Sequence, residues 1–79
     1  MMNETVDALR QAIETAIPGA QVAVRNPSGG HYELSVVSPA FEGKTPLAQQ
    51  RLVFSAIGHL MKGDAAPVHA IDKMDLRTK

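Results

Sequence analysis

The sequence predicts a single α+β domain over residues 1–79, in which two helices pack on one face of a three-stranded mixed sheet. A length of 79 residues leaves room for one hydrophobic core. The spacing of apolar residues alternates between helical and strand periods, in the order helix, strand, strand, helix, strand. The last two strands are joined through a predicted helix of about 17 residues, a connection that suits parallel neighbours.

The first segment has the spacing of an amphipathic helix. Apolar residues recur at three- and four-residue steps from Val6 to Ile17, with charged side chains between them. Asn3 or Thr5 is expected to cap its start. Apolar and polar residues then alternate, which predicts a half-buried strand over about 20–26.

A hairpin is predicted next. Residues 26–30, N-P-S-G-G, have the composition of a turn, because proline fixes φ and glycine permits positive φ. A second strand follows over about 31–38, with Tyr32, Leu34 and Val36 on one face. A connection this short makes the two strands antiparallel.

The second half of the chain predicts a helix and a third strand. Phe41 lies in a loop and is expected to fill the core, and Thr45 followed by Pro46 is a strong helix start. Gly63 is expected to end this helix. A last strand is predicted over roughly 67–72, and the tail beyond it either extends the strand or frays.

This topology brings two histidines together. His31 opens the second strand and His69 opens the third. Parallel strands joined by a crossover begin at the same edge of the sheet. We therefore expect both imidazoles at one end of the sheet, beside the glycine-rich turn.

Two interpretations of these histidines stay open. A histidine at a strand end is commonly solvated or hydrogen-bonded, but neutral imidazole is also the commonest nitrogen ligand for metals. Closed zinc sites need about four ligands, and neither Asp64 nor Glu33 is an obvious third. A partner would therefore have to complete any metal site. His59, on the second helix, is interpreted as solvated surface.

Composition excludes several functions. Lysine plus arginine number 8 and aspartate plus glutamate number 8, so the formal net charge is zero, which weighs against nucleic-acid binding. The chain has no cysteine, which excludes disulfides, thiolate nucleophiles and self-contained cysteine-ligated clusters. No nucleophile motif or phosphate-binding glycine motif is present, so we expect no enzyme. Without a signal peptide or a membrane-length apolar run, we expect a cytoplasmic protein that does not associate with membranes.

Three runs together resemble the BolA-like protein family. They are G-H-Y-E-L (30–34), V-V-S-P-A-F-E-G-K-T-P-L-A-Q-Q-R-L-V-F (36–54) and P-V-H-A-I (67–71). They match the family's second strand, its F-E-G segment with the following helix, and its H-A strand. The likeness covers nearly the whole chain, from the first helix to the last strand.

The resemblance implies a fold similar to class II KH domains and a non-enzymatic adaptor role in iron–sulfur cluster trafficking and iron homeostasis. It implies a monothiol glutaredoxin as partner, with glutathione, and a shared [2Fe–2S] cluster that the chain does not hold tightly alone. The implied metal ligands are His69 of the H-A pair and, near the first two strands, His31, the only histidine there. Alternatives are a KH-like nucleic-acid-binding transcriptional regulator and a protein-binding module without metal. The glycines lack the G-x-x-G spacing with which KH domains grip the nucleic-acid backbone.

Overall fold

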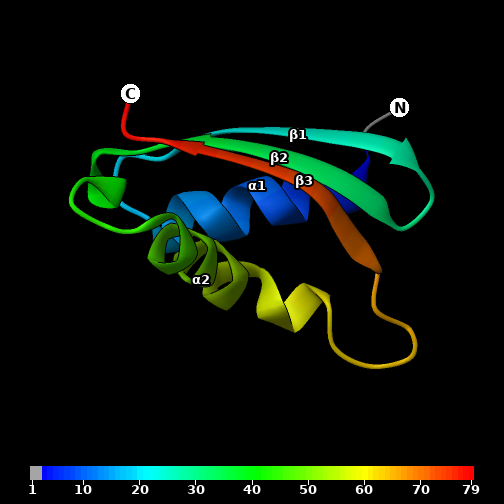
Figure 1. The fold of residues 1–79 in the computed structure, drawn as a ribbon. Helices are drawn as coiled ribbons and strands as arrows, with labels where there is room; N and C mark the ends of the chain where they lie inside the picture. Colours follow the sequence, from blue (N-terminus) through cyan, green and yellow to red (C-terminus); the bar gives the residue numbers. More distant parts are fainter. Residues whose placement is uncertain (1–2) are drawn as a thin grey trace.

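The structure, a computed structural model, describes residues 3–79 and has two helices on one face of a three-stranded sheet (Figure 1). The predicted α+β class and order of elements are confirmed. The elements are α1 Glu4–Ala16, β1 Gln21–Ser28, β2 His31–Val37, the 3₁₀ helix η1 Pro39–Phe41, α2 Pro46–Ile57, the 3₁₀ helix η2 Gly58–Leu60 and β3 Ala70–Arg77.

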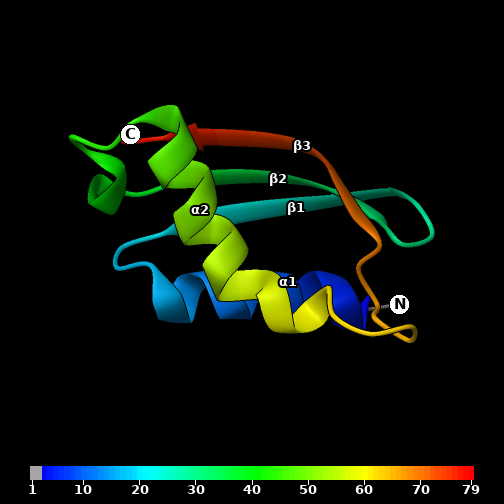
Figure 2. The ribbon, with the colours of Figure 1, turned by 60° about the horizontal axis from the view of Figure 1, so that its bottom comes forward.

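The central strand is β2, and it pairs antiparallel with β1 and parallel with β3. The hairpin aligns Val22 with Val36. The parallel pair aligns Tyr32 with Ile71. Helix α2 makes the crossover between the parallel strands, passing beneath the sheet from the side of β3 towards α1 (Figure 2). The predicted adjacency of the second and third strands is therefore confirmed.

Side-chain caps fix where both helices begin. The Asn3 side chain accepts hydrogen bonds from the backbone N–H groups of Thr5 and Val6. At the start of α2, the Thr45 hydroxyl accepts from the N–H of Ala48 at 3.1 Å. These bonds satisfy N–H groups that have no partner within the helix.

The core lies between the sheet and the two helices. Every second residue of β2 points into it, because strand side chains alternate between faces. Phe41 is fully buried, which confirms that this residue fills the core. The buried hydrophobic side chains that pack together are Leu9, Ile13, Ile17, Tyr32, Leu34, Val36, Phe41, Val53, Ile57 and Val68.

The predicted turn was too long. Strand β1 continues through Asn26 and Pro27 to Ser28, so the turn is reduced to two glycines. A register irregularity between Arg25 and Ser28 accommodates the proline, which has no N–H to donate to a ladder. The Asn26 side-chain amide donates to the backbone carbonyls of Ser28 and His31 (2.6 and 2.7 Å), which closes the hairpin end.

The predicted end of the second helix was also wrong. Helix α2 stops at Ile57 and continues only as the 3₁₀ helix η2, because Gly58 is a poor helix former. Gly63, which was expected to end the helix, lies beyond it in the following turn with φ of +88°.

The third strand begins later and ends later than predicted. Pro67 cannot donate to a ladder, and the N–H of Val68 bonds to Leu60 rather than to the sheet. Strand β3 therefore begins at Ala70, and the tail extends it to Arg77.

Candidate histidine site at one end of the sheet

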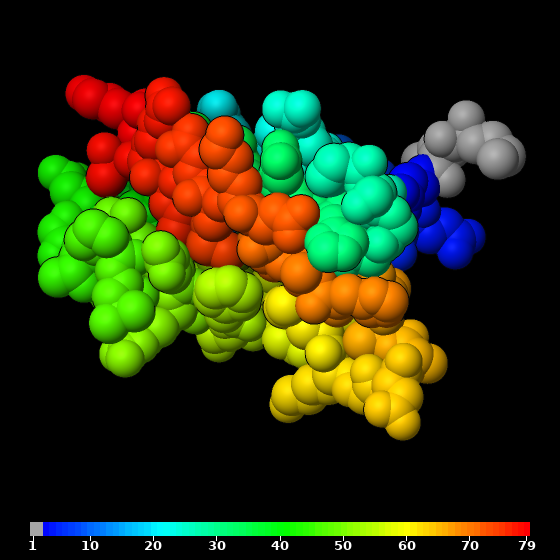
Figure 3. Space-filling view, turned by 45° about the vertical axis from the view of Figure 1, so that its right-hand side comes forward, coloured from blue at the N-terminus to red at the C-terminus, as the bar shows by residue number. Residues whose placement is uncertain are grey.

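His31 and His69 lie at the same end of the sheet, as the sequence predicted. His31 is aligned with Ala70 in the parallel pair. The N–H groups of His69 and Ala70 both donate to the carbonyl of Gly30, at 2.8 and 3.1 Å. These bonds hold the start of β3 against the hairpin turn, and Figure 3 shows the turn in contact with the orange segment that leads into β3.

His69 is exposed and lies directly before β3, between buried Val68 and half-buried Ala70. Its imidazole rests on Gly30. A Cβ atom at that glycine would lie 2.6 Å from Nδ1 and 2.8 Å from Cγ of His69, well inside normal contact distance. Gly30 also has φ of +76°, which favours glycine. The position of the His69 ring therefore depends on the missing side chain at residue 30.

His31 is held by a carboxylate. Its Nδ1 lies 3.1 Å from Oδ1 of Asp72, and both side chains are nearly half exposed. An ionised carboxylate can only accept, so Nδ1 is the donor in this hydrogen bond, and in the neutral ring Nε2 is the nitrogen with the lone pair. Metal-ligating histidines commonly donate their second N–H to a carboxylate in this way. The His31–Asp72 pair thus has the chemistry of an oriented ligand.

Two imidazoles are the donors that this site offers. Across residues 3–79, no group of three or more histidine, cysteine, aspartate or glutamate residues is placed to hold a metal ion. In Rieske centres, two histidines replace two cysteines on one iron of a [2Fe–2S] cluster. By donor type, two imidazoles suit such a half-site, and the other ligands would have to come from outside the chain.

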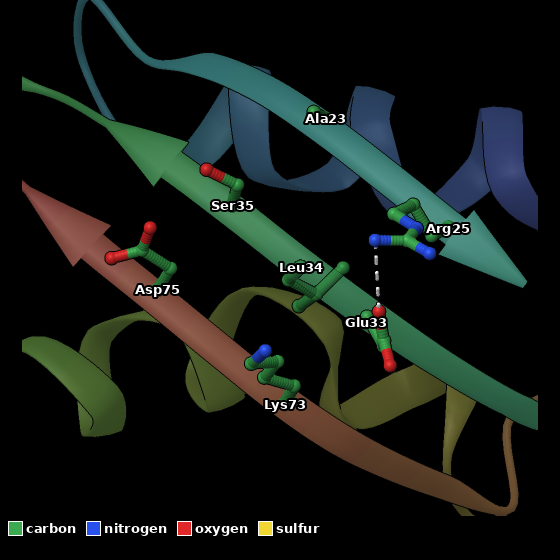
Figure 4. Close-up of a pocket in the computed structure, with 7 residues that line it drawn as sticks. All are labelled: Ala23, Arg25, Glu33, Leu34, Ser35, Lys73 and Asp75. Atoms are coloured by element: carbon green, nitrogen blue, oxygen red, sulfur yellow. Dashed lines mark ion pairs between the residues drawn. The ribbon is translucent and has the colours of Figure 1, made fainter.

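The remaining polar residues considered from the sequence do not contribute to this site. His59 is exposed in η2 and borders a shallow hollow between the two helices, as expected for a solvated residue. Glu33 pairs with Arg25 at 3.6 Å on the outer face of the sheet (Figure 4). Asp64 is exposed in the segment between η2 and β3.

Sequence reasoning did not identify Gly30 or Asp72. The glycine pair before His31 was assigned only a role in the turn, although glycine beside a candidate ligand also signals close approach of another group. Asp72 is the extra residue where the register shifts between Tyr32 and Glu33 of β2. A β-bulge changes the direction in which a side chain points. The alternation of apolar and polar residues in the sequence does not show where such a bulge occurs.

The geometry defines a class: a small α+β domain with exposed imidazoles where two parallel strands begin. Within residues 3–79, neither helix is long and apolar enough to cross a membrane. The family model described as "BolA-like protein" matches residues 3–79. The chain belongs to the BolA-like family.

Individual relatives support this assignment. BolA-like protein 1 from mouse is 37% identical, over 81% of this chain and 51% of its own length. The chain therefore spans about half the length of the curated relatives it matches. A BolA homologue from Coxiella burnetii has a solved structure with a TM-score of 0.76 and 33% identity, covering 99% of this chain and 92% of that one. The solution structure of mouse BolA1 has a TM-score of 0.75 and 31% identity, covering 98% of this chain and 68% of that one.

Proposed function

We propose that this protein is a non-enzymatic adaptor in iron–sulfur cluster trafficking, which pairs with a monothiol glutaredoxin and shares a [2Fe–2S] cluster as its cargo. The observation that carries the proposal is the exposed His69 ring, which rests on Gly30 at the end of the sheet where His31 also lies. Family membership supports it, since the resemblance implies a ligand role for the histidine of the H-A pair. The glutaredoxin cysteine and a glutathione thiol would supply the other ligands.

His69 and His31 have separate roles in this proposal. His69 is the primary ligand, since it is exposed and its backbone is anchored by the hydrogen bond to Gly30. His31 is the second nitrogen donor, through Nε2, because Asp72 holds Nδ1. Both side chains lie on rigid backbone at a sheet end, which keeps the donors in place before a partner arrives.

Imidazole ligation suits transfer of a cluster. Replacing thiolates by neutral imidazoles makes a [2Fe–2S] cluster less negative and raises its reduction potential. Imidazole also binds or releases a proton near neutral pH, so a histidine ligand can be exchanged more readily than a permanent thiolate.

The test is reconstitution with a monothiol glutaredoxin, glutathione, ferrous iron and sulfide under anaerobic conditions, followed by visible absorption and circular dichroism. The parent protein should give a mixed-complex spectrum that differs from that of the glutaredoxin alone. His69→Ala should lose this spectrum, and His31→Ala should weaken or alter it. His59→Ala is the matched control, because this histidine lies away from the site.

Binding should be measured separately from ligation. Titration calorimetry with cluster-free glutaredoxin should give similar affinities for the parent and His69→Ala, because one imidazole is a small part of a protein interface. An unchanged spectrum for His69→Ala would show that this histidine is not a ligand. Failure of the parent to bind glutaredoxin in either form would refute the adaptor role.

Nucleic-acid binding is not proposed. A binder of this size would carry a basic stripe that neutralises phosphates. On the outer sheet face, basic and acidic side chains alternate instead: Arg25, Glu33, Lys73 and Asp75 all border the same hollow (Figure 4).

A further inference from the structure

We propose that a second copy of this chain pairs with the free edge of β3. The two β3 strands would run antiparallel about a two-fold axis at Met74, which joins two three-stranded sheets into one sheet of six strands. This interaction is independent of the cluster-sharing function proposed above.

The backbone of β3 is suited to this pairing. Within residues 3–79, β3 is an edge strand, because β2 is the one strand that lies beside it. The carbonyl of Arg77 accepts from Ser38 next to β2 at 2.9 Å, so it faces the sheet. Successive residues of a strand direct their backbone groups to opposite sides, so those of Met74 and Leu76 point outward. An unpaired row of this kind is a template for another strand.

A row of alternating charge crosses the outer face of the sheet. Arg25 is aligned with Glu33, and Glu33 with Lys73, in neighbouring strands. Arg25 and Glu33 form an ion pair at 3.6 Å. The row is therefore positive, negative, positive, and it ends at the β3 edge in the ammonium group of Lys73, as Figure 4 shows. A negative group in the next strand would continue the alternation.

A second copy supplies that negative group. With Met74 opposite Met74, the flanking pairs place Lys73 of each copy opposite Asp75 of the other. These are the pairs with the closest side chains in an antiparallel ladder. Arg77 donates two hydrogen bonds to Asp75, at 3.2 and 2.9 Å, which orient this carboxylate. Each of its oxygens keeps a second lone pair that can accept from Lys73 of the other copy.

Symmetric registers one residue away are unfavourable. Moving the axis by one residue sets Lys73 against Lys73 or Asp75 against Asp75, and like charges directly opposite destabilise a sheet. Those residues also direct their backbone groups towards β2. The opposite edge of the sheet, β1, contains Pro27 and a register irregularity, and its one charged residue is Arg25. An axis at Leu76 would set Asp75 against Arg77, but these two side chains already pair within each copy, so that register adds no new charge pair. Charge complementarity therefore favours β3, with Met74 at the axis.

The helix side of the same edge is apolar. Met74 and Leu76 are half-buried there, and Gln50 of α2 borders a shallow hollow with them. Leu47 and Phe54 share this face of α2, because residues three, four and seven apart are neighbours on a helix. They are 55% and 41% exposed, unusual values for large apolar side chains. A second copy extending the sheet would cover part of this surface.

The charge pairs can be tested by sedimentation equilibrium from micromolar to millimolar concentration. Lys73→Glu and Asp75→Lys should each weaken self-association about tenfold or more, because each change places like charges opposite one another twice. An equimolar mixture of the two variants should associate as tightly as the parent, since both pairs become attractive again. Lys62→Glu makes the same charge change at an exposed residue away from β3 and should have no effect.

The register can be tested by cross-linking, since the parent has no cysteine. Hydrogen-bonded antiparallel pairs have Cα atoms about 5.5 Å apart, within disulfide range. Met74→Cys should therefore form a covalent dimer under mild oxidation, much faster than Val22→Cys on the β1 edge. A parent that stays monomeric at millimolar concentration would refute the proposal. So would a variant mixture no tighter than its components, or equal cross-linking of the two cysteine variants.

Discussion

Replacing Gly30 by alanine should displace the His69 ring without removing either imidazole. The new Cβ would lie 2.6 Å from Nδ1 of His69, whereas ordinary contacts begin at 3.4 Å. The ring must therefore retreat by about 0.8 Å, the difference between these distances. A positive φ of +76° costs alanine roughly a further 1–2 kcal/mol. Gly29→Ala is the matched control, because nothing lies within 4 Å of its Cβ position and its φ is not positive.

Two measurements separate stability from ring position. In urea unfolding, Gly30→Ala should lose about 1–2 kcal/mol or more relative to Gly29→Ala. NMR spectra should show shifted ring resonances for His69 in Gly30→Ala alone. The proposed sharing of a cluster with glutaredoxin should fall in the same variant. Unchanged His69 resonances together with full stability would refute the argument that the bare Cα of Gly30 positions this histidine.

Two further variants test the surroundings of the site and the core. Asp72→Ala should free the His31 ring, which should change the nitrogen resonances of His31 but not those of His59. The free energy of unfolding should change by less than about 1 kcal/mol, because the His31–Asp72 pair is exposed. Unaltered His31 resonances would count against the hydrogen bond. Ser38→Ala should destabilise the fold by about 1–3 kcal/mol in thermal unfolding, since the buried hydroxyl donates to the Pro18 carbonyl at 2.6 Å and accepts from Ala40 at 3.0 Å. If Ser38→Ala lost less stability than Ser55→Ala, a change at an exposed serine, the role of the buried hydroxyl would be contradicted.

The parts of the fold set by hydrophobic period and by capping could be predicted from the sequence. The alternation in β2, the Thr45 cap and the crossover through α2 are local signals, and together they place His31 and His69 at one end of the sheet. The ends of β1 and β3 depend instead on tertiary hydrogen bonds. The low strand propensity of proline predicted that β1 would end before Pro27. The strand continues to Ser28 because the Asn26 side chain bonds to the backbone carbonyls of Ser28 and His31.

The bulge at Asp72 prevented the full length of β3 from being predicted from the sequence. Beyond it, Lys73, Asp75 and Arg77 alternate with Met74 and Leu76 in the period of a half-buried strand. The extra residue shifts that period relative to Ala70 and Ile71, so the two halves do not join as one pattern. The same shift brings Asp72 to His31, which explains why the end of the strand and the hydrogen-bond partner of His31 were both missed.

The two-glycine turn has a consequence for how quickly a partner can engage. A long, mobile hairpin loop would have to be immobilised whenever a complex forms, at a cost in conformational entropy for every residue ordered. Here Gly30 accepts hydrogen bonds from two successive residues at the head of β3, so little remains to be ordered. Under the proposed cluster-sharing function, this rigidity would let the chain bind and release its partner repeatedly with little ordering cost in each cycle.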